Sequence, residues 1–287
     1  MRTLIFILLV FAVCWFAADC ARAAELQVPQ NAVAGQPLTI HVAGSGTLYL
    51  IGPGQVIKRE FKSGSVEIKG EELRNAGRWI AAVEGGNQSQ VFWVKPGKPG
   101  KLNFLARPSR VPVARKDVIS GVAFVFDQYQ NMVIEPTPVN FKLSVGEAAG
   151  SSKTVTSRAG VAWTTSGSAS KAGAAQFVAT ANDTSVRRVV QQVAADPCER
   201  SLRMHVAGRS GNMVTIETDP IRDCSGNPVP DGTIVTFIQT DKTGRSTVDA
   251  RIKKDIARAE LPASDSATVT VAAGVVLGNE LHIGGKQ

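Results

Sequence analysis

The sequence has few of the residues on which most enzyme and metal sites depend. It contains three histidines, His41, His205 and His282, and four cysteines among 287 residues. The histidines lie far apart, so a zinc site built from clustered histidine or cysteine ligands is not expected. His41 and His205 each stand in an alternating apolar run, "LTIHV" and "LRMHV", and are expected to be ordinary strand residues.

Motifs that carry catalysis are also missing. Ser168 and Lys171, in "SASK", have the spacing of some serine acyl-transfer enzymes, but such a pair must share a helical turn. Here the two residues lie among glycine and serine in an expected loop. The segment "GKPGK" lacks the spacing of a phosphate loop, and proline removes a backbone donor. We therefore expect a protein that is not an enzyme, with no catalytic residue, no cofactor and no metal.

One long apolar run is present, at the N-terminus. It extends from Leu4 to Ala18, follows Arg2, and precedes the small residues Ala21 and Ala23. This order is typical of a secretory signal peptide, and we predict one at 1–23, with cleavage after Ala23. No later segment approaches the length of a transmembrane helix, so the mature chain is expected not to span a membrane. The predicted location is periplasmic, cell-surface or extracellular.

Cysteine is scarce in the exported chain. Cleavage would remove Cys14 and Cys20 and leave Cys198 and Cys224. Two cysteines in an exported protein most simply form one disulfide, so we predict a bond between these two. It would connect the first strand of the third domain to the turn after its second strand.

Helical periodicity is hard to find in the rest of the sequence. Short runs rich in Val, Ile, Thr and Phe recur instead, separated by Gly, Pro, Asn, Asp and Ser; "PLTIHV", "TLYLIG" and "SQVFWV" are three of them. Such runs are typical of an all-β sandwich. Only "GEELRNAG", residues 70–77, looks like a helical turn.

Two stretches predict domain boundaries. Residues 95–101, "KPGKPGK", are rich in proline and glycine, and "AADPCE" at 194–199 is a second break. The chain is long enough for two or three domains of about 80 to 100 residues each. We predict three sandwich domains after the signal peptide, at 24–95, 96–195 and 196–287.

Two segments of the sequence repeat one another. "FDQYQNMVIEPTPVNF" at 126–141 and "RDCSGNPVPDGTIVTF" at 222–237 both have Asp, Asn four residues later, and Phe ten residues after the Asn. These residues are Asp127, Asn131 and Phe141 in the first copy and Asp223, Asn227 and Phe237 in the second. The second and third domains are therefore expected to be copies of one unit. The first copy lacks the thiol, the serine and the glycines of "DCSGNPVPDG", so we interpret the shared residues as those of a loop between two strands.

The second copy carries a family resemblance. The order D-x-x-G-N-P-V-P-D-G-T-x-V-x-F, from Asp223 to Phe237, resembles the bacterial immunoglobulin-like domains of the invasin and intimin type. The resemblance is strongest over 198–283, weaker over 100–195, and limited to a general immunoglobulin-like pattern over 25–94. It implies tandem immunoglobulin-like β-sandwiches that serve as a stalk or an adhesive surface of a bacterial cell envelope. It implies no catalytic site and carries over no ligand-binding residue.

The charge balance is basic, with a formal net charge of +8. Four cations lie close together at the start of the second domain, at Arg107, Arg110, Arg115 and Lys116. They predict a patch for anionic polymers such as acidic polysaccharide. The alternative is that they keep edge strands soluble and unpaired. Nucleic acid is not expected as a partner.

The tryptophans are the other candidates for binding. Trp79, Trp93 and Trp163 are expected to pack in the core or between domains. Strand alternation would send one of Phe92 and Trp93 inward and the other outward, where an exposed tryptophan could stack on a sugar ring.

Two hypotheses for the function remain open. We favour an exported, non-enzymatic structural or adhesive protein of the bacterial cell envelope, whose partner is a protein or glycan of the envelope or exterior. The competing hypothesis is a soluble binding module for an anionic glycan or for an envelope or secretion-system protein, which could pair through an edge strand. The sequence predicts no oligomeric state.

Overall fold

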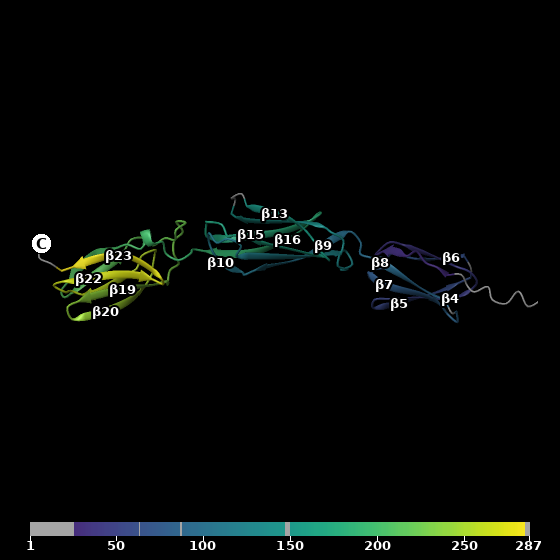
Figure 1. The fold of residues 1–287 in the computed structure, drawn as a ribbon, viewed down its shortest axis with the longest axis horizontal. Coiled ribbons are helices and arrows are strands. Elements are labelled where there is room, and N and C mark those ends of the chain that lie inside the picture. Colours follow the sequence, from purple (N-terminus) through teal and green to yellow (C-terminus); the bar gives the residue numbers. More distant parts are fainter. Residues whose placement is uncertain (1–25, 63, 87, 147–149, 285–287) are drawn as a thin grey trace, which may run out of the picture. The chain divides into compact units, whose positions relative to one another are not determined.

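The structure is a computed structural model that describes residues 26–62, 64–86, 88–146 and 150–284 (Figure 1). The predicted signal peptide, 1–23, lies outside the described residues and stays a prediction. The secondary structure of the described residues consists of β-strands and one short 3-10 helix, η1 (Glu199–Ser201). By the density of its contacts the chain divides into two units. The first runs to Lys101 and includes Phe124–Thr137 and Ser157–Gly160, and the second contains the remaining segments.

The first two sheets form a sandwich around one apolar core. One sheet has the order β1-β3-β6 and the other β2-β8-β7-β4-β5. Their strands are β1 (Leu26–Gln27), β2 (Asn31–Val33), β3 (Leu38–Val42), β4 (Gly46–Gly52), β5 (Gln55–Phe61), β6 (Gly64–Ile68), β7 (Gly77–Val83) and β8 (Ser89–Lys95). Side chains alternate between buried and exposed along β3, as the period of a strand requires. The core includes Trp79 and Phe92, whose ring centroids lie 6.1 Å apart.

The second sandwich pairs a five-stranded sheet, β10-β16-β15-β12-β13, with a three-stranded sheet, β14-β11-β9. Its strands are β9 (Pro99–Arg107), β10 (Arg110–Pro112), β11 (Ile119–Asp127), β12 (Pro138–Val145), β13 (Ser151–Thr156), β14 (Val161–Ser166), β15 (Gly173–Ala181) and β16 (Thr184–Val193). Three phenylalanines fill the space between the sheets: the ring centroid of Phe104 lies 5.8 Å from that of Phe141 and 5.2 Å from that of Phe177. Gly121 on β11 lets these rings approach the sheet closely. A Cβ atom there would lie 2.8 Å from the ring of Phe177.

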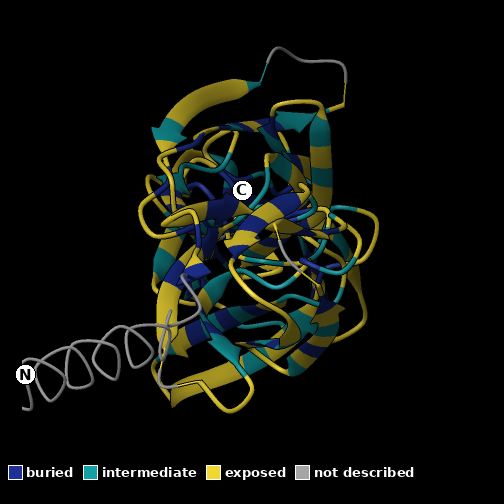
Figure 2. Ribbon diagram, turned by 90° about the vertical axis from the view of Figure 1, so that its right-hand side faces the viewer, coloured by how far each residue is buried: buried dark blue, intermediate teal, exposed yellow. Residues whose placement is uncertain are grey.

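The third sandwich has the sheets β17-β18-β21 and β20-β19-β22-β23. Its strands are β17 (Met204–Ser210), β18 (Met213–Thr218), β19 (Ile234–Asp241), β20 (Gly244–Arg251), β21 (Arg258–Pro262), β22 (Ala267–Ala273) and β23 (Val276–Ile283). Phe237, Ile216 and Val271 belong to one buried apolar cluster that takes residues from both sheets. Figure 2 shows buried and exposed stretches alternating along the strands.

The predicted fold class, all-β with sandwiches in tandem, is confirmed. The prediction of a helical turn over 70–77 is wrong, because no helix is found there. Residues 70–72 form a short turn, in which the N–H groups of Glu72 and Leu73 donate to the carbonyls of Lys69 and Gly70. The chain leaves this turn at Leu73, whose side chain is fully buried in the first core, and the residues from Leu73 to Ala76 have no regular secondary structure. The domain limits at 24–95, 96–195 and 196–287 stay a prediction.

The close approach of Phe177 to Gly121 gives a test of the second core. We expect Gly121→Ala to lower the free energy of unfolding by about 1–3 kcal/mol, as overpacking of a filled core does. Gly208 on β17 is the matched control, because a Cβ atom there would meet nothing within 4 Å. Urea denaturation followed by circular dichroism compares the two variants. Equal unfolding midpoints for Gly121→Ala and Gly208→Ala would contradict the packing described.

Candidate functional site

The two repeated segments contain the buried carboxylates. Asp127 ends β11 and Asp223 follows β18; among the described residues they are the only charged side chains that are buried. The Oδ1 atom of Asp127 accepts hydrogen bonds of 2.9 Å from the N–H groups of Tyr129 and Asn131. The aspartate therefore acts as the predicted loop residue, because its side chain accepts hydrogen bonds from the backbone that follows it.

The second copy has the same geometry. Asp223 Oδ1 accepts from the N–H groups of Ser225 at 2.8 Å and Asn227 at 2.9 Å. In each copy the asparagine side chain also donates to its own aspartate, at 2.8 Å in the first and 3.0 Å in the second. We call each set, Asp127 with Asn131 and Asp223 with Asn227, an aspartate-asparagine pair.

The other carboxylate oxygen of each pair binds the segment that leads into its sandwich. Asp127 Oδ2 accepts from the N–H group of Gly97 at 2.9 Å, and Asp223 Oδ2 accepts from that of Ala195 at 3.0 Å. Gly97 lies in the proline- and glycine-rich stretch 95–101, and Ala195 lies in the second predicted break. Each aspartate thus fixes the backbone on both sides of its own sequence position.

Each asparagine binds a loop that lies more than 50 residues earlier in the chain, within the same unit. Asn131 donates to the carbonyl of Arg74 at 2.7 Å and accepts from the N–H group of Ala76 at 2.9 Å. Asn227 donates in the same way to the carbonyl of Ser170 at 2.7 Å. It accepts from the N–H group of Ala172 at 2.8 Å. Sequence reasoning missed these bonds, although the retention of Asn in both copies was their signal.

The hydrogen bonds determine the charge state of Asp223. Burial alone would raise the pKa of its carboxyl group. The side-chain and backbone bonds from Asn227, and the backbone bonds from Ala195 and Ser225, outweigh burial and hold the pKa below its ordinary value. Asp223 is therefore ionised at neutral pH and accepts hydrogen bonds, and it has no proton to supply to a substrate.

Cys198 and Cys224 form the predicted disulfide, with Cα atoms 4.7 Å apart. Cys224 lies in the turn after β18, directly after Asp223. Cys198 precedes η1, and its N–H group donates to the carbonyl of Arg222 at 2.8 Å. The expectation that the bond would begin on the first strand of the third sandwich is wrong, because η1 lies between Cys198 and β17.

The histidines and the serine-lysine motif lie where ordinary residues would. His41 is on β3 and His205 on β17, which confirms that they are strand residues; His282 is on β23. No group of three His, Cys, Asp or Glu side chains in the described part of the chain is placed to hold a metal ion. Ser168 and Lys171 lie in a loop, as expected.

The tryptophans differ from one another. Trp79 is fully buried, and its indole N–H donates to the carbonyl of Asn75 at 2.9 Å. The expectation of core packing is wrong for Trp93, which is 54% exposed, and for Trp163, which is 59% exposed. Phe92 takes the inward position next to Trp93, so alternation along β8 turns Trp93 outward.

The four predicted patch residues are all exposed. Arg107 ends β9, Arg110 begins β10, and Arg115 and Lys116 lie in the loop after β10. No ion pair joins any of them to a carboxylate of the described chain. Their binding of anionic polymers stays a prediction.

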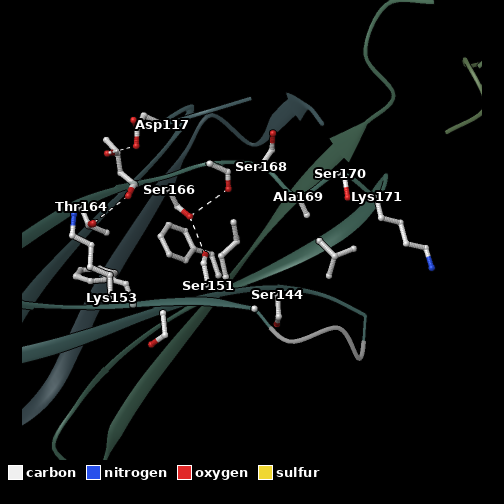
Figure 3. Close-up of a pocket in the computed structure, with 18 residues that line it drawn as sticks. Asp117, Ser144, Ser151, Lys153, Thr164, Ser166, Ser168, Ala169, Ser170 and Lys171 are labelled. Carbon is white, nitrogen blue, oxygen red and sulfur yellow. Dashed lines mark hydrogen bonds between the residues drawn. The ribbon is translucent and has the colours of Figure 1, made fainter. Parts of the chain in front are cut away.

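A hollow of about 630 Å³ lies in the second sandwich, where the edge strands of its two sheets, β13 and β14, come together (Figure 3). Phe141, Leu143 and Phe177 contribute buried apolar side chains to its lining. The rest of the lining is rich in hydroxyl groups. These come from Ser144, Ser151, Ser152, Thr164, Thr165, Ser166, Ser168 and Ser170.

Several hydrogen bonds join two loops beside the hollow. The N–H group of Ala114 donates to the carbonyl of Ala169 at 2.9 Å, and that of Ser168 donates to the carbonyl of Arg115 at 2.8 Å. The Ser168 hydroxyl donates to the carbonyl of Pro112 at 2.7 Å and accepts from the N–H group of Arg115 at 2.9 Å. The Ser168 hydroxyl is therefore occupied by the backbone, which is unsuited to a nucleophile.

No helix of the described chain combines the length and the apolar character that crossing a bilayer requires.

The lowered pKa of Asp223 predicts a loss of stability in acid. A carboxyl group with a depressed folded-state pKa stabilises the fold above its unfolded pKa of about 3.9, and this contribution is lost as the pH falls through the folded value. We expect Asp223→Asn to lower the free energy of unfolding at pH 7 by about 1–3 kcal/mol, because it disturbs a buried hydrogen-bonded group. The variant should also lose less stability than the wild type below about pH 4.

The control for this prediction is Asp231→Asn. Asp231 lies in the same loop, is exposed, and accepts none of the hydrogen bonds described. Urea denaturation between pH 2.5 and 7 measures all three proteins. Parallel pH curves for the wild type and Asp223→Asn would show that the pair does not hold an ionised carboxylate.

Comparison with known proteins shows that the chain has a fold similar to that of several solved structures. No family model matches the chain, and no curated protein matches its sequence. Among solved structures, the Escherichia coli adhesin FdeC superimposes with a TM-score of 0.59 at 14% identity, covering 92% of this chain and 99% of that one. InvD of Yersinia pseudotuberculosis superimposes with a TM-score of 0.50 at 11% identity, covering 91% of this chain and 98% of that one.

Invasin, described as a bacterial integrin-binding protein, also superimposes with a TM-score of 0.50 at 14% identity. The match covers 91% of this chain and 59% of invasin, so the chain spans about three fifths of that structure. The resemblance that the sequence indicates is thereby confirmed at the level of the fold. The chain consists of tandem immunoglobulin-like β-sandwiches of the kind found in these bacterial proteins.

Proposed function

We propose that the protein is an exported, non-enzymatic adhesive component of the bacterial cell envelope, built from tandem immunoglobulin-like sandwiches. The observation that carries this proposal is that the buried carboxylates have a structural role. Both Asp127 and Asp223 are fully engaged with backbone and asparagine groups. The buried charges of the described chain therefore serve the connections of the sandwiches.

The N-terminal residue order and the cysteines support export. The N-terminal sequence has the order of a secretory signal, and the bond between Cys198 and Cys224 suits an oxidising compartment. The protein acts in the periplasm, on the cell surface or outside the cell. Its partner is a protein or glycan of the envelope or exterior.

An exposed apolar row on the first sandwich supports adhesion to a protein partner. Val91, Ile80, Ile51 and Val56 are cross-strand neighbours on β8, β7, β4 and β5. Val91 is 46% exposed, Ile51 45% and Val56 62%. Trp93, on the same face of β8 as Val91, adds an exposed indole. Contiguous exposed apolar side chains of this kind mark interaction surfaces in soluble domains.

The likeness to adhesins of known structure agrees with this proposal. FdeC is described as an adhesin and invasin as an integrin-binding protein. The competing hypothesis, a binding module for an anionic glycan, is favoured by one specific observation, the hydroxyl-lined hollow of the second sandwich.

The proposal predicts that the purified chain holds particles to a surface. Beads coated with it should resist flow on cultured epithelial cells or on an immobilised bacterial envelope fraction, whereas uncoated beads detach. Ile51→Lys/Val56→Lys should reduce retention several-fold, because it places two charges in the apolar row. Thr39→Lys, an exposed change on the opposite sheet, is the control. Detachment of wild-type beads from both surfaces at the rate of uncoated beads would refute the adhesive function.

A further inference from the structure

The hollow of the second sandwich has the two kinds of lining that a sugar ring needs. Phe141, Leu143 and Phe177, each at most 5% exposed, close the base of the hollow beneath the ring, and its wall of hydroxyl-bearing side chains is polar. Its volume of about 630 Å³ lies within the range of about 300–1,000 Å³ that is typical of small-ligand sites.

Part of the polar lining is free to bind. Figure 3 shows the hydroxyls of Ser151 and Ser166 facing one another, with Lys153 and Lys171 on either side of this pair. The two hydroxyls share a hydrogen bond of 3.4 Å, and the Ser166 hydroxyl also donates to the carbonyl of Gly167 at 3.4 Å. Among the described residues, the ammonium groups of Lys153 and Lys171 have no carboxylate partner. No hydrogen bond joins the Ser170 hydroxyl to another residue that the structure describes.

The charge around the hollow is positive. Lys153 and Lys171 line it, and the loop that contributes Asp117 to the lining also carries Arg115 and Lys116. Asp117, the one carboxylate among the described lining residues, already accepts a hydrogen bond of 3.1 Å from the Thr165 hydroxyl. An anionic ligand is therefore favoured over a neutral or cationic one.

The rim of the hollow is held in place without a ligand. A Cβ atom on Gly167 would lie 3.0 Å from the carbonyl oxygen of Arg115 and 3.5 Å from the Cα atom of Lys116, so the two loops are in close contact. The N–H group of Ala169 also donates to the buried side-chain carbonyl of Gln192 at 2.8 Å. A rim fastened in this way loses little conformational freedom when it binds.

We propose that this hollow binds an acidic sugar unit of an oligosaccharide. The ring lies over the apolar base, the unpaired Ser170 hydroxyl bonds a ring hydroxyl, and Lys153 and Lys171 pair with carboxylate or sulfate groups on the bound sugar and its neighbour. Arg115 and Lys116, two of the four predicted patch residues, add to the attraction from the rim. This inference rests on the proposed function, since it names a glycan as a partner of the exported chain.

Defined oligosaccharides test the ligand chemistry. The probes are an oligogalacturonide, which carries carboxylates, the same oligosaccharide with its carboxylates methyl-esterified, and a heparin tetrasaccharide, which adds sulfates. Isothermal titration of the full mature chain should show binding of at least one acidic probe, weakened by added salt, and no binding of the esterified probe. Binding of the oligogalacturonide identifies a carboxylate as sufficient, and binding of heparin alone identifies a sulfate requirement.

Two variants test the place of binding. Lys153→Gln/Lys171→Gln should weaken binding about fivefold, the loss expected from two exposed ion pairs. Lys142→Gln is the matched control, because Lys142 lies on β12 between the lining residues Phe141 and Leu143 but is exposed on the opposite face of the sheet. Ser166→Phe fills the hollow without changing its charge, and should abolish binding while the circular dichroism spectrum stays that of the wild type.

The results that would overturn the proposal are distinct. They are no binding of either acidic probe, equal binding of the esterified probe, or unchanged binding by Lys153→Gln/Lys171→Gln. Unchanged binding by a folded Ser166→Phe variant would mean that anions bind only to surface charge. If glycan binding fails these tests while coated beads are still retained, the hollow is refuted and the adhesive function stands, so the two proposals fail separately.

Discussion

Two buried carboxylates, Asp127 and Asp223, accept hydrogen bonds from their own loops, from the segments that lead into their sandwiches, and from the asparagine four residues later. Asn131 and Asn227 in turn bind earlier loops. A buried charge is tolerated only when it is paired or fully hydrogen-bonded, so each carboxylate requires all of these partners at once. This requirement makes the loops between sandwiches specific structures, and the disulfide of Cys198 with Cys224 adds a covalent bond beside the second of them.

The same requirement separates the polar residues into two groups. The buried carboxylates and their asparagines serve the connections, whereas the polar residues that line the hollow between β13 and β14 include groups that the protein leaves unpaired. The hollow exists because both sheets of the second sandwich end at that side, so β13 and β14 are edges that do not cover one another completely. Exposed edges attract unwanted strands, and Lys153 on β13 is a charge of the kind that prevents such pairing. Here the same charge also favours an anionic ligand.

Local patterns in the sequence predicted the strands, the tandem sandwiches and the cysteine pairing. Burial alternates with a period of two along many of the strands, β3 and β11 among them, and only two cysteines remain after the predicted cleavage. The repeat identified Asp223 and Asn227 as loop residues, but it could not locate Ser170 and Ala172 as partners, because their bonds close over more than 50 residues. The hollow could not be predicted for the same reason. Its lining depends on the order of strands in two sheets. The local sequence "TTSGSASK" does not indicate which strand of the other sheet lies beside it.

The amide hydrogens of Ala172 and Ala195 give the most direct test of the central claim, that the repeated motif is a structural connection. These N–H groups donate to the side chains of Asn227 and Asp223. Hydrogen exchange followed by NMR should find both amides protected in the wild type. In Asn227→Ala the protection of Ala172 should be lost, while the amides of the core strand β19 keep theirs. Rapid exchange of Ala172 and Ala195 in the wild type, at the rate of an exposed loop, would contradict the account.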